Sequence, residues 1–331
     1  MIIPQEIRQS VFQISGEKEF TDLSLKIFRF QYESNPVYRE MAQLLKADPA
    51  EIKNYLQIPF IPVSLFRNKK IISGDDDIFK KVFTSSGTTA SVPSHHYVKD
   101  LTLYEDSFTR SFQIFYGNPE NFRFLALLPG YLEREGSSLV YMLHHFIRRT
   151  VRHGSGFFLH DLESLRKKLL ENDSLLSKTI LFGASYALLD FAEQSPMDIS
   201  RVIVMETGGM KGRRKEMIRE ELHEILCRNF NVNMIHSEYG MTELLSQAYS
   251  SGNGVFRSPP WMKILIRDVN DPLHYLPSGQ TGGINIIDLA NLYSCSFIAT
   301  QDLGKIHEDG SFEIIGRFDD SDVRGCNLLV V

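Results

Sequence analysis

Hydroxyl side chains gather around a glycine at residues 84–89, where the sequence reads Thr-Ser-Ser-Gly-Thr-Thr. The short apolar run at residues 81–83 precedes them and predicts the end of a strand. Backbone N–H groups beside a flexible glycine, together with rotatable hydroxyls, can surround a phosphate without a fixed charge. The same composition is also typical of an ordinary surface loop. The candidate phosphate ligands are Thr84, Ser85, Ser86, Gly87, Thr88 and Thr89.

A second stretch, residues 236–243, combines an aromatic ring, a glycine, a hydroxyl and a carboxylate after the apolar run 232–235. Tyr239 offers a face for stacking, Thr242 a phosphate donor, and Glu243 an oxygen ligand for a metal ion. Parallel sheets bind ligands at the carboxyl ends of their strands. The alternative is that Tyr239 packs in the core and Glu243 caps a turn.

Near the C-terminus, an aspartate and an arginine flank a predicted hairpin. Asp302 can accept hydrogen bonds from both hydroxyls of a ribose, and Arg317 can donate to ribose or phosphate oxygens. Each is a weak indication by itself, because an aspartate beside a turn usually serves only the turn.

The elements that must position these residues alternate between short β-type runs and helical segments. Strands are predicted at residues 122–128, 179–182, 201–205 and 232–236. Residues 214–228 show one apolar helical face, and residues 20–45 predict two helices joined at Pro36. The alternation predicts an α/β domain with a largely parallel sheet. After Trp261 the runs at 264–266, 283–288, 296–299, 304–307 and 312–315 predict a smaller β-rich subdomain.

The composition is that of an ordinary globular protein, with 43% hydrophobic and 23% charged residues in a chain of 331. A net charge of −5 argues against nucleic acid as a partner. Neither a signal peptide nor a long apolar run is visible, so we expect a cytoplasmic protein without an integral membrane segment. Cys227, Cys295 and Cys326 are too few and too scattered for a disulfide framework, so we expect free thiols.

Taken in order, the chemical segments resemble the motif set of the adenylate-forming superfamily, which contains acyl-CoA synthetases, aryl-CoA ligases and luciferases. Residues 84–89 resemble its phosphate loop, and residues 239–243 its adenine-stacking and magnesium motif. Asp302 is similar to its ribose-binding aspartate, and residues 316–320 to the segment that leads into its interdomain hinge. The resemblance implies ATP (AMP) and Mg²⁺, with Glu243 as the metal ligand. It adds Gly208, Gly209, Tyr239, Gly240, Met241, Asp302 and Arg317 to the nucleotide-binding residues.

A narrower resemblance covers nearly the whole chain. Residues 31–38, 61–66, 128–139 and 324–327 resemble the LuxE-type acyl-protein synthetase family. Members of this family activate a fatty acid with ATP and carry it as a thioester on a cysteine near their C-terminus, a position that Cys326 matches. The resemblance implies catalytic roles for Cys326, Thr242 and Glu243. It also implies a fatty or other hydrophobic acid as substrate, and an acyl-acceptor protein such as an acyl reductase as a possible partner.

The environment of Cys326 leaves two interpretations open. A cation two residues away, Arg324, favours the thiolate and so the nucleophile. On the residues alone, Cys326 is equally well explained as a small apolar residue of a C-terminal strand.

The resemblance implies an α/β body like the N-terminal domain of adenylate-forming enzymes, with mixed and parallel sheets flanked by helices. Residues 1–80 are expected to form a helical segment packed on the core, and residues 81–255 a nucleotide- and acyl-binding subdomain. Residues 256–315 are expected to form the β-rich subdomain, and residues 316–331 a hinge-like end. Because the chain stops at Val331, we expect the C-terminal lid domain and its catalytic lysine to be absent.

Three positions depart from the superfamily pattern. Ala90 stands where a glycine is usual, Ser94 lies near the usual lysine, and Gln301 replaces the usual glycine before the aspartate. The phosphate loop therefore has to work with hydroxyls, backbone N–H groups and Mg²⁺, or with help from another chain.

Other functions fit parts of the sequence. Residues 183–187 partly match a nucleophile elbow with Ser185, which would make the protein a serine hydrolase or acyltransferase, but the last glycine is missing. A non-catalytic adenylate-binding subunit and an aryl-CoA ligase-like substrate range also stay open. The histidine pairs at 95–96 and 144–145 lack the carboxylate or cysteine spacing of a metal site.

Overall fold

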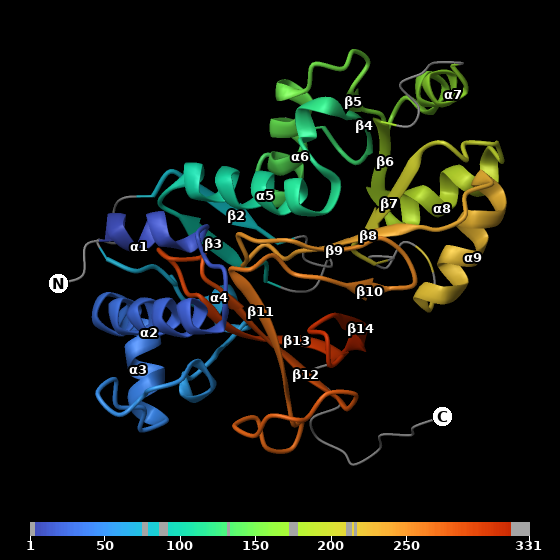
Figure 1. Cartoon of the computed structure of the whole chain (residues 1–331). Coiled ribbons are helices and arrows are strands. Elements are labelled where there is room, and N and C mark those ends of the chain that lie inside the picture. Colours follow the sequence, from blue (N-terminus) through green and yellow to red (C-terminus); the bar gives the residue numbers. More distant parts are fainter. Residues whose placement is uncertain are drawn as a thin grey trace. The chain divides into compact units, whose positions relative to one another are not determined.

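The structure is a computed structural model that describes residues 4–74, 79–85, 92–130, 133–171, 178–209, 214 and 217–318 (Figure 1). The chain divides into two compact units. The first unit joins Met1–Asp77 to Pro260–Val331, and the second unit is Ile78–Pro259. The N-terminal helices and the β-rich segment therefore share one unit, and the chemical stretches at 84–89 and 236–243 share the other.

Helices open the first unit. They are α1 (Pro4–Val11), α2 (Glu17–Ser34), α3 (Pro36–Leu44), the 3₁₀ turn η1 (Tyr55–Gln57) and α4 (Leu65–Asn68). The break predicted at Pro36 is confirmed, and its cause is local. The side chain of Asn35 accepts a hydrogen bond from the backbone N–H of Tyr38, and Pro36 occupies the first turn of α3, where no N–H is needed.

An antiparallel sheet completes the first unit. Its strands β11 (Met262–Arg267), β12 (Thr281–Asp288), β13 (Phe297–Ile306) and β14 (Phe312–Arg317) pair in chain order, and β1 (Ile61–Pro62) lies parallel to β13. The prediction of separate runs at 296–299 and 304–307 is wrong, because both belong to β13. The glycine at 304 does not end the strand; a Cβ there would meet the carbonyl oxygen of Glu313 on β14.

The second unit contains the predicted parallel sheet. Its order is β5 (Gly156–Phe157), β4 (Arg123–Leu127), β6 (Thr179–Ala184), β7 (Ile203–Thr207), β8 (His236–Tyr239) and β9 (Ala248–Ser250). Only β9 runs antiparallel to its neighbour. The connecting helices are α5 (Leu101–Tyr116), α6 (Ser138–Arg149), α7 (Leu162–Leu170), α8 (Ser185–Gln194) and α9 (Arg219–Phe230). All residues of β4 and β6 are buried, as expected of parallel strands covered on both faces.

One boundary in this sheet differs from the prediction. The strand expected at 232–236 begins only at His236, and α9 runs to Phe230. Asn231 ends the helix in the left-handed conformation, and the apolar residues Val232 and Ile235 are buried in the connection instead of in the ladder. Four short elements also belong to this unit: the paired strands β2 (Lys81–Thr84) and β3 (His95–Val98), the 3₁₀ turn η2 (Pro119–Asn121) and β10 (Val255–Phe256).

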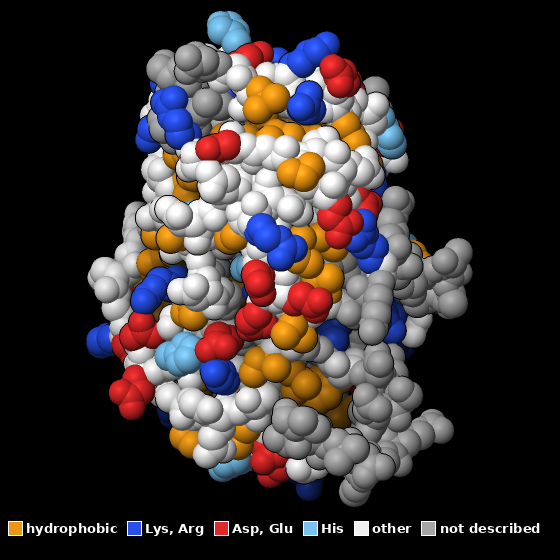
Figure 2. Space-filling view, turned by 90° about the vertical axis from the view of Figure 1, so that its right-hand side faces the viewer, with side chains coloured by type: hydrophobic (Ala, Val, Ile, Leu, Met, Phe, Trp, Pro, Cys, Tyr) orange, Lys and Arg blue, Asp and Glu red, His pale blue; other side chains and the backbone are white. Residues whose placement is uncertain are grey.

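Basic and acidic side chains are interspersed over the described part of the face shown in Figure 2, with several acidic side chains close together near its middle. No helix in the described part of the chain combines the length and the apolarity needed to cross a bilayer.

Candidate functional site

The predicted phosphate loop connects β2 to β3 in the second unit. Thr84 pairs with His95 at the end of this hairpin. The backbone N–H of Ser85 donates to the carbonyl of Ser94 at 3.1 Å, and the N–H of Ser94 donates to the Ser85 hydroxyl at 2.9 Å. These bonds close the base of the loop. Its tip, including Ser86, Gly87, Thr88 and Thr89, lies outside the described residues.

The loop base is attached to the predicted magnesium motif. The Ser94 hydroxyl donates to the Glu243 carboxylate, and Nδ1 of His96 lies 2.8 Å from the carbonyl oxygen of Thr242. Glu243 is only 6% exposed, so this contact is shielded from bulk water. Two segments that the sequence marks separately, 149 positions apart, are therefore brought together. Neither Ser94 nor His96 was among the predicted ligands.

The rest of this motif is tightly packed at the end of β8. The ring of Tyr239 makes an edge contact with Phe256 at 6.1 Å, and its hydroxyl lies 3.7 Å from the sulfur of Met241. A Cβ on Gly240 would stand 2.6 Å from Oε1 of Glu238. A side chain at 240 would therefore force this carboxylate, which also accepts a hydrogen bond from Thr207, to shift.

The predicted glycine turn follows β7, the neighbour of β8. Gly208 has a φ of 67°, the left-handed region that favours glycine. Both Gly208 and Gly209 are exposed. Thr207 pairs with Glu238 across the two parallel strands, so the turn lies beside the segment that begins at Tyr239. Within this unit the ends of β7 and β8 form one edge, as expected of a ligand site in a parallel sheet.

Ser185, the serine of the partial elbow, has a different setting from a nucleophile. It is 2% exposed at the start of α8. Its hydroxyl donates to Oε2 of Glu206 at 2.8 Å and lies 2.6 Å from the carbonyl oxygen of Gly208. A serine nucleophile needs a neighbouring base and access to substrate. Here the single proton of the hydroxyl lies between a carboxylate and a main-chain carbonyl, and the group is shielded from solvent.

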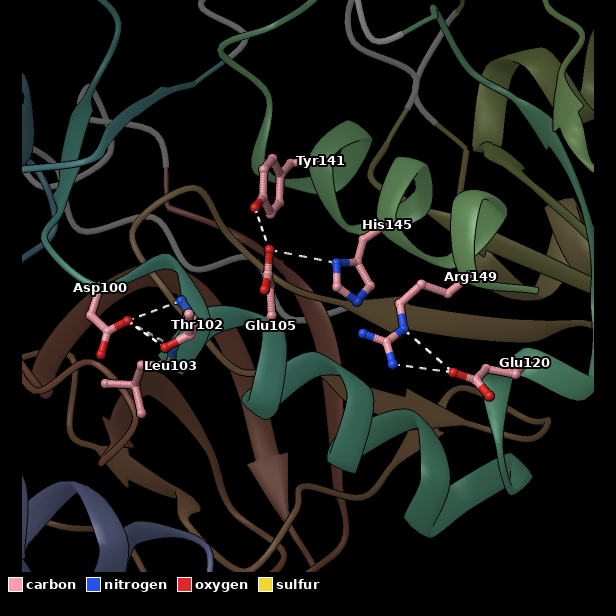
Figure 3. A network of polar contacts seen from close by, with 8 residues as sticks. All are labelled: Asp100, Thr102, Leu103, Glu105, Glu120, Tyr141, His145 and Arg149. Atoms are coloured by element: carbon pink, nitrogen blue, oxygen red, sulfur yellow. Dashed lines mark hydrogen bonds and ion pairs between the residues drawn. The ribbon is translucent and has the colours of Figure 1, made fainter. Parts of the chain in front are cut away.

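The β2–β3 hairpin is also held by contacts of β2 with residues that precede and begin α6. The N–H of Thr84 donates to the carbonyl of Gly136 at 2.7 Å. Tyr141 of α6 packs on Phe83 at 5.6 Å, and its hydroxyl donates to Glu105 of α5 at 2.6 Å (Figure 3). The β2 strand is therefore fixed to both helices.

The same close-up shows further contacts of α6, one with α5 and one with η2. Nδ1 of His145 lies 3.5 Å from Glu105, and Arg149 pairs with Glu120 (Figure 3). Burial lowers the pKa of His145, and the Glu105 carboxylate acts in the opposite direction. A hollow of about 120 Å³ beside these residues is lined by Gln113, Asn118 and Phe146 among others.

In the first unit, Asp302 and Arg317 face each other across β13 and β14. They are register partners, and Nε of Arg317 lies 3.0 Å from Oδ1 of Asp302. The carboxylate side chain is 10% exposed and the arginine side chain 67%. The arginine can be reached from solvent, whereas the carboxylate that it pairs with is largely buried.

Arg267, a second arginine of the first unit, was not among the site residues predicted from the sequence. One end of its guanidinium donates to the carbonyl of Ile284 and to Oδ1 of Asn285, both at 2.7 Å. The other end donates to the carbonyl of Thr300 at 2.6 Å. A side chain at residue 283 would collide with this guanidinium, so the glycine there makes its place. Arg267 therefore ties β12 to β13 just before Asp302.

The two described cysteines differ in their accessibility to solvent. Burial raises the pKa of Cys295 to about 12, and burial also raises the pKa of Cys227. Cys295 is fully buried, whereas Cys227 is partly accessible. Cys326 lies outside the described residues. Neither described thiol is set up as a nucleophile.

Metal ligands are sparse in the part of the chain that the structure describes. No group of three histidine, cysteine or carboxylate side chains is close enough to hold a metal ion there. Mg²⁺ is commonly held by one or two carboxylates together with substrate phosphates, so Glu243 beside the phosphate loop fits a nucleotide-bound Mg²⁺.

Comparison with known proteins supports the resemblance to one family. A family model described as acyl-protein synthetase, LuxE, matches residues 11–115. The long-chain-fatty-acid--luciferin-component ligase of Vibrio harveyi is 23% identical, over 96% of this chain and 89% of the ligase. The protein of the same name from Aliivibrio fischeri is 22% identical over 99% of this chain and 91% of its own. The resemblance to the LuxE family is confirmed.

Solved structures agree on the fold. Postadenylation 2-hydroxyisobutyryl-CoA ligase in complex with 2-HIB-AMP matches 93% of this chain and 70% of its own, with a TM-score of 0.65 and 14% identity. ATP-bound MatB from Rhodopseudomonas palustris matches 71% of this chain with a TM-score of 0.54 and 17% identity. The match covers 47% of MatB, so this chain spans about half of that protein's length. The α/β fold of the adenylate-forming ligases is confirmed.

Proposed function

We propose that this chain, which resembles the LuxE acyl-protein synthetases, is an AMP-forming acid–thiol ligase. It activates a fatty or other hydrophobic carboxylic acid with ATP and then transfers the acyl group to a thiol. The names of the two curated relatives supply the substrate class, a long-chain fatty acid. The adenylate-forming fold supports the reaction type.

One observation supports the proposal most strongly, the attachment of the phosphate-loop hairpin to the Thr242 and Glu243 segment. A hydroxyl-rich loop and a carboxylate are both needed where ATP loses pyrophosphate, because the leaving group carries several negative charges. The bonds from Ser94 and His96 hold these two parts in one place within the second unit.

The first step needs no protein nucleophile. A carboxylate oxygen of the acid forms a bond to the α-phosphorus of ATP, the bond from that phosphorus to the bridging oxygen breaks, and pyrophosphate leaves. The hydroxyls of Thr88, Thr89 and Thr242 are proposed to donate to phosphate oxygens as charge shifts to the leaving group. Mg²⁺, when bound at Glu243, offsets phosphate charge.

In the second step a thiolate attacks the acyl carbonyl. The bond from this carbon to the adenylate oxygen breaks, and AMP leaves with that oxygen. We propose Cys326 as the first acceptor, with a partner protein such as an acyl reductase, or CoA, as a further one. Burial of Cys295 and Cys227 favours Cys326 by contrast, since a raised pKa leaves little thiolate at neutral pH.

The remaining nucleotide contacts follow from the resemblance and stay proposals. Gly208 and Gly209 form the turn against the adenine, Tyr239 with Gly240 and Met241 its stacking segment, and Asp302 with Arg317 the ribose contact. The exposed position of the glycines after β7 is compatible with this role.

Pyrophosphate exchange separates the candidate functions. The ligase incorporates labelled pyrophosphate into ATP only when a fatty acid is present. A non-catalytic adenylate-binding subunit binds ATP without exchange, and a serine hydrolase cleaves an acyl ester without ATP. A panel of aliphatic and aromatic acids in the same assay tests the aryl-CoA ligase-like substrate range.

A further inference from the structure

A buried carboxylate, Glu206, lies one residue before the end of β7 and has no part in the proposed reaction. It is 4% exposed. Besides the Ser185 hydroxyl, two cationic or polar groups of α9 approach its Oε1. Nε of Arg219 lies 3.5 Å away, and Nε2 of His223 lies 3.6 Å away.

These neighbours keep the carboxylate charged. Burial by itself raises the pKa of Glu206, but His223, Arg219, Ser237 and Ser185 together bring that pKa below the ordinary value of 4.5. A buried ion pair seldom stabilises a fold more than apolar residues of the same volume do. Stability alone therefore gives no reason for a carboxylate at this position.

One set of contacts leads from Glu206 to the glycine turn at Gly208. The Ser185 hydroxyl lies within hydrogen-bond distance of both the Glu206 carboxylate and the carbonyl oxygen of Gly208. Gly208 is a left-handed residue of the turn, and its carbonyl oxygen is the atom that contacts Ser185. Ser185 thereby couples the carboxylate to the backbone that follows β7.

A second set of contacts leads from Glu206 to Tyr239, the last residue of β8. The guanidinium of Arg219 lies over the ring of Phe256, 5.1 Å from its centre. Phe256 in turn makes the edge contact with Tyr239 at 6.1 Å. A series of contacts thus leads from Glu206 through Arg219 and Phe256 to Tyr239.

We propose that Glu206 is a positioning residue that sets the Gly208 turn through Ser185 and the Tyr239 ring through Arg219, and so determines affinity for the adenine of ATP. This inference rests on the proposed function, in which these two segments face the adenine. No direct contact between Glu206 and the nucleotide is implied.

The test compares Glu206→Gln with Glu171→Gln. Glu171 also pairs with a buried arginine of the second unit, Arg123, at 3.2 Å, but it lies on the α7 side of the sheet. The dissociation constant of ATP is measured by equilibrium titration, and the KM of the fatty acid by pyrophosphate exchange. Hydrogen exchange is followed in peptides that cover residues 207–209 and 237–243.

We expect Glu206→Gln to weaken ATP binding about tenfold, as loss of one charge-assisted contact does, with less than about a twofold change in the KM of the acid. Both peptides exchange faster. Ser185→Ala, which keeps the carboxylate, weakens ATP binding and speeds exchange only at 207–209. Glu171→Gln changes none of these quantities.

Wild-type protein that binds no ATP would overturn the proposed function. Wild-type binding with an unchanged constant in Glu206→Gln would overturn only the positioning role. If Glu206→Gln does not fold, Ser185→Ala decides: unchanged ATP affinity and unchanged exchange at 207–209 in that variant contradict the inference.

Discussion

The hydroxyl of Ser94 donates a hydrogen bond to the carboxylate of Glu243 across 149 positions of sequence. This bond joins the base of the hydroxyl-rich loop to the carboxylate proposed for Mg²⁺. The side chain near the loop position where related enzymes usually have a lysine therefore contacts an acidic partner in this protein. A short polar hydroxyl holds the loop without adding charge to it.

Replacing Ser94 with alanine removes this donor from a buried carboxylate. We expect a loss of about 2 kcal/mol in unfolding free energy and a roughly tenfold rise in the KM of ATP, with little change in the KM of the acid. Urea unfolding and steady-state kinetics measure both. The matched control is Ser111→Ala in α5, whose buried hydroxyl has no hydrogen-bond partner among the described residues, so its loss is neutral or stabilising. Equal effects of the two changes would contradict the role of Ser94.

A methyl group at position 240 collides with the Glu238 carboxylate at 2.6 Å. Glu238 is 7% exposed and bonded to Thr207, so it has little room to move. We expect Gly240→Ala to destabilise the protein by about 1–3 kcal/mol and to reduce ATP binding. Gly316→Ala, in β14 with open space around it, leaves stability unchanged in the same thermal unfolding measurement. A Gly240→Ala protein with unchanged stability and unchanged ATP binding would show that the Glu238 carboxylate moves freely.

His236 makes stability depend on pH. Burial lowers the pKa of His236 from 6.5, and its Nδ1 lies 3.0 Å from the Tyr116 hydroxyl. The folded protein therefore keeps the ring neutral while the unfolded chain takes up a proton near pH 6.5. Stability is complete above that pH and falls as the pH decreases below it.

Urea midpoints at pH 7.5 and 5.8 measure this slope. His236→Asn flattens it without abolishing it, because His144 and His145 also have pKa values lowered by burial. A His236→Asn protein with the full wild-type slope would show that His236 does not contribute.

Arg267 holds the bulged strands of the first unit through three acceptors. A lysine in its place cannot reproduce the forked set of bonds to Ile284, Asn285 and Thr300. We expect Arg267→Lys to lower the unfolding free energy by about 2 kcal/mol in urea titrations. The comparison is Arg317→Lys, where the exposed side chain contributes less than about 1 kcal/mol. Similar losses of unfolding free energy in both variants would argue against the proposed role of Arg267 in holding the strands.

Acyl transfer predicts one labelled cysteine. After incubation with radiolabelled fatty acid, ATP and Mg²⁺, we expect a hydroxylamine-sensitive adduct that disappears in Cys326→Ala. It persists in Cys295→Ala and Cys227→Ala, because burial raises the pKa of both thiols. Undiminished label in Cys326→Ala would rule out its role as acyl carrier.

The sequence was sufficient to predict the parallel sheet, because β4 and β6 are apolar runs bounded by helical patterns. It misplaced the start of β8, since Val232 and Ile235 are as apolar as a strand but are buried in a connection. It also split β13 at Gly304, where the missing side chain serves close strand packing and not a turn. Local composition cannot distinguish these cases.

The site residues show a similar division. The hydroxyls of 84–89 and the carboxylate at 243 are chemically conspicuous, so type and spacing mark them. Ser94, His96 and Glu206 are not conspicuous, and their importance depends on partners that are distant in sequence. Only the folded chain brings those partners within bonding distance.

Isotope transfer tests the central claim, that the acid attacks the α-phosphate of ATP. The protein is incubated with a fatty acid labelled with ¹⁸O in its carboxylate, together with ATP, Mg²⁺ and a thiol acceptor, and the nucleotide products are analysed by mass spectrometry. We predict one ¹⁸O in the phosphate of AMP, because the adenylate oxygen leaves with AMP when the thiol ester forms. Label found in inorganic phosphate with ADP as the nucleotide product would contradict the account.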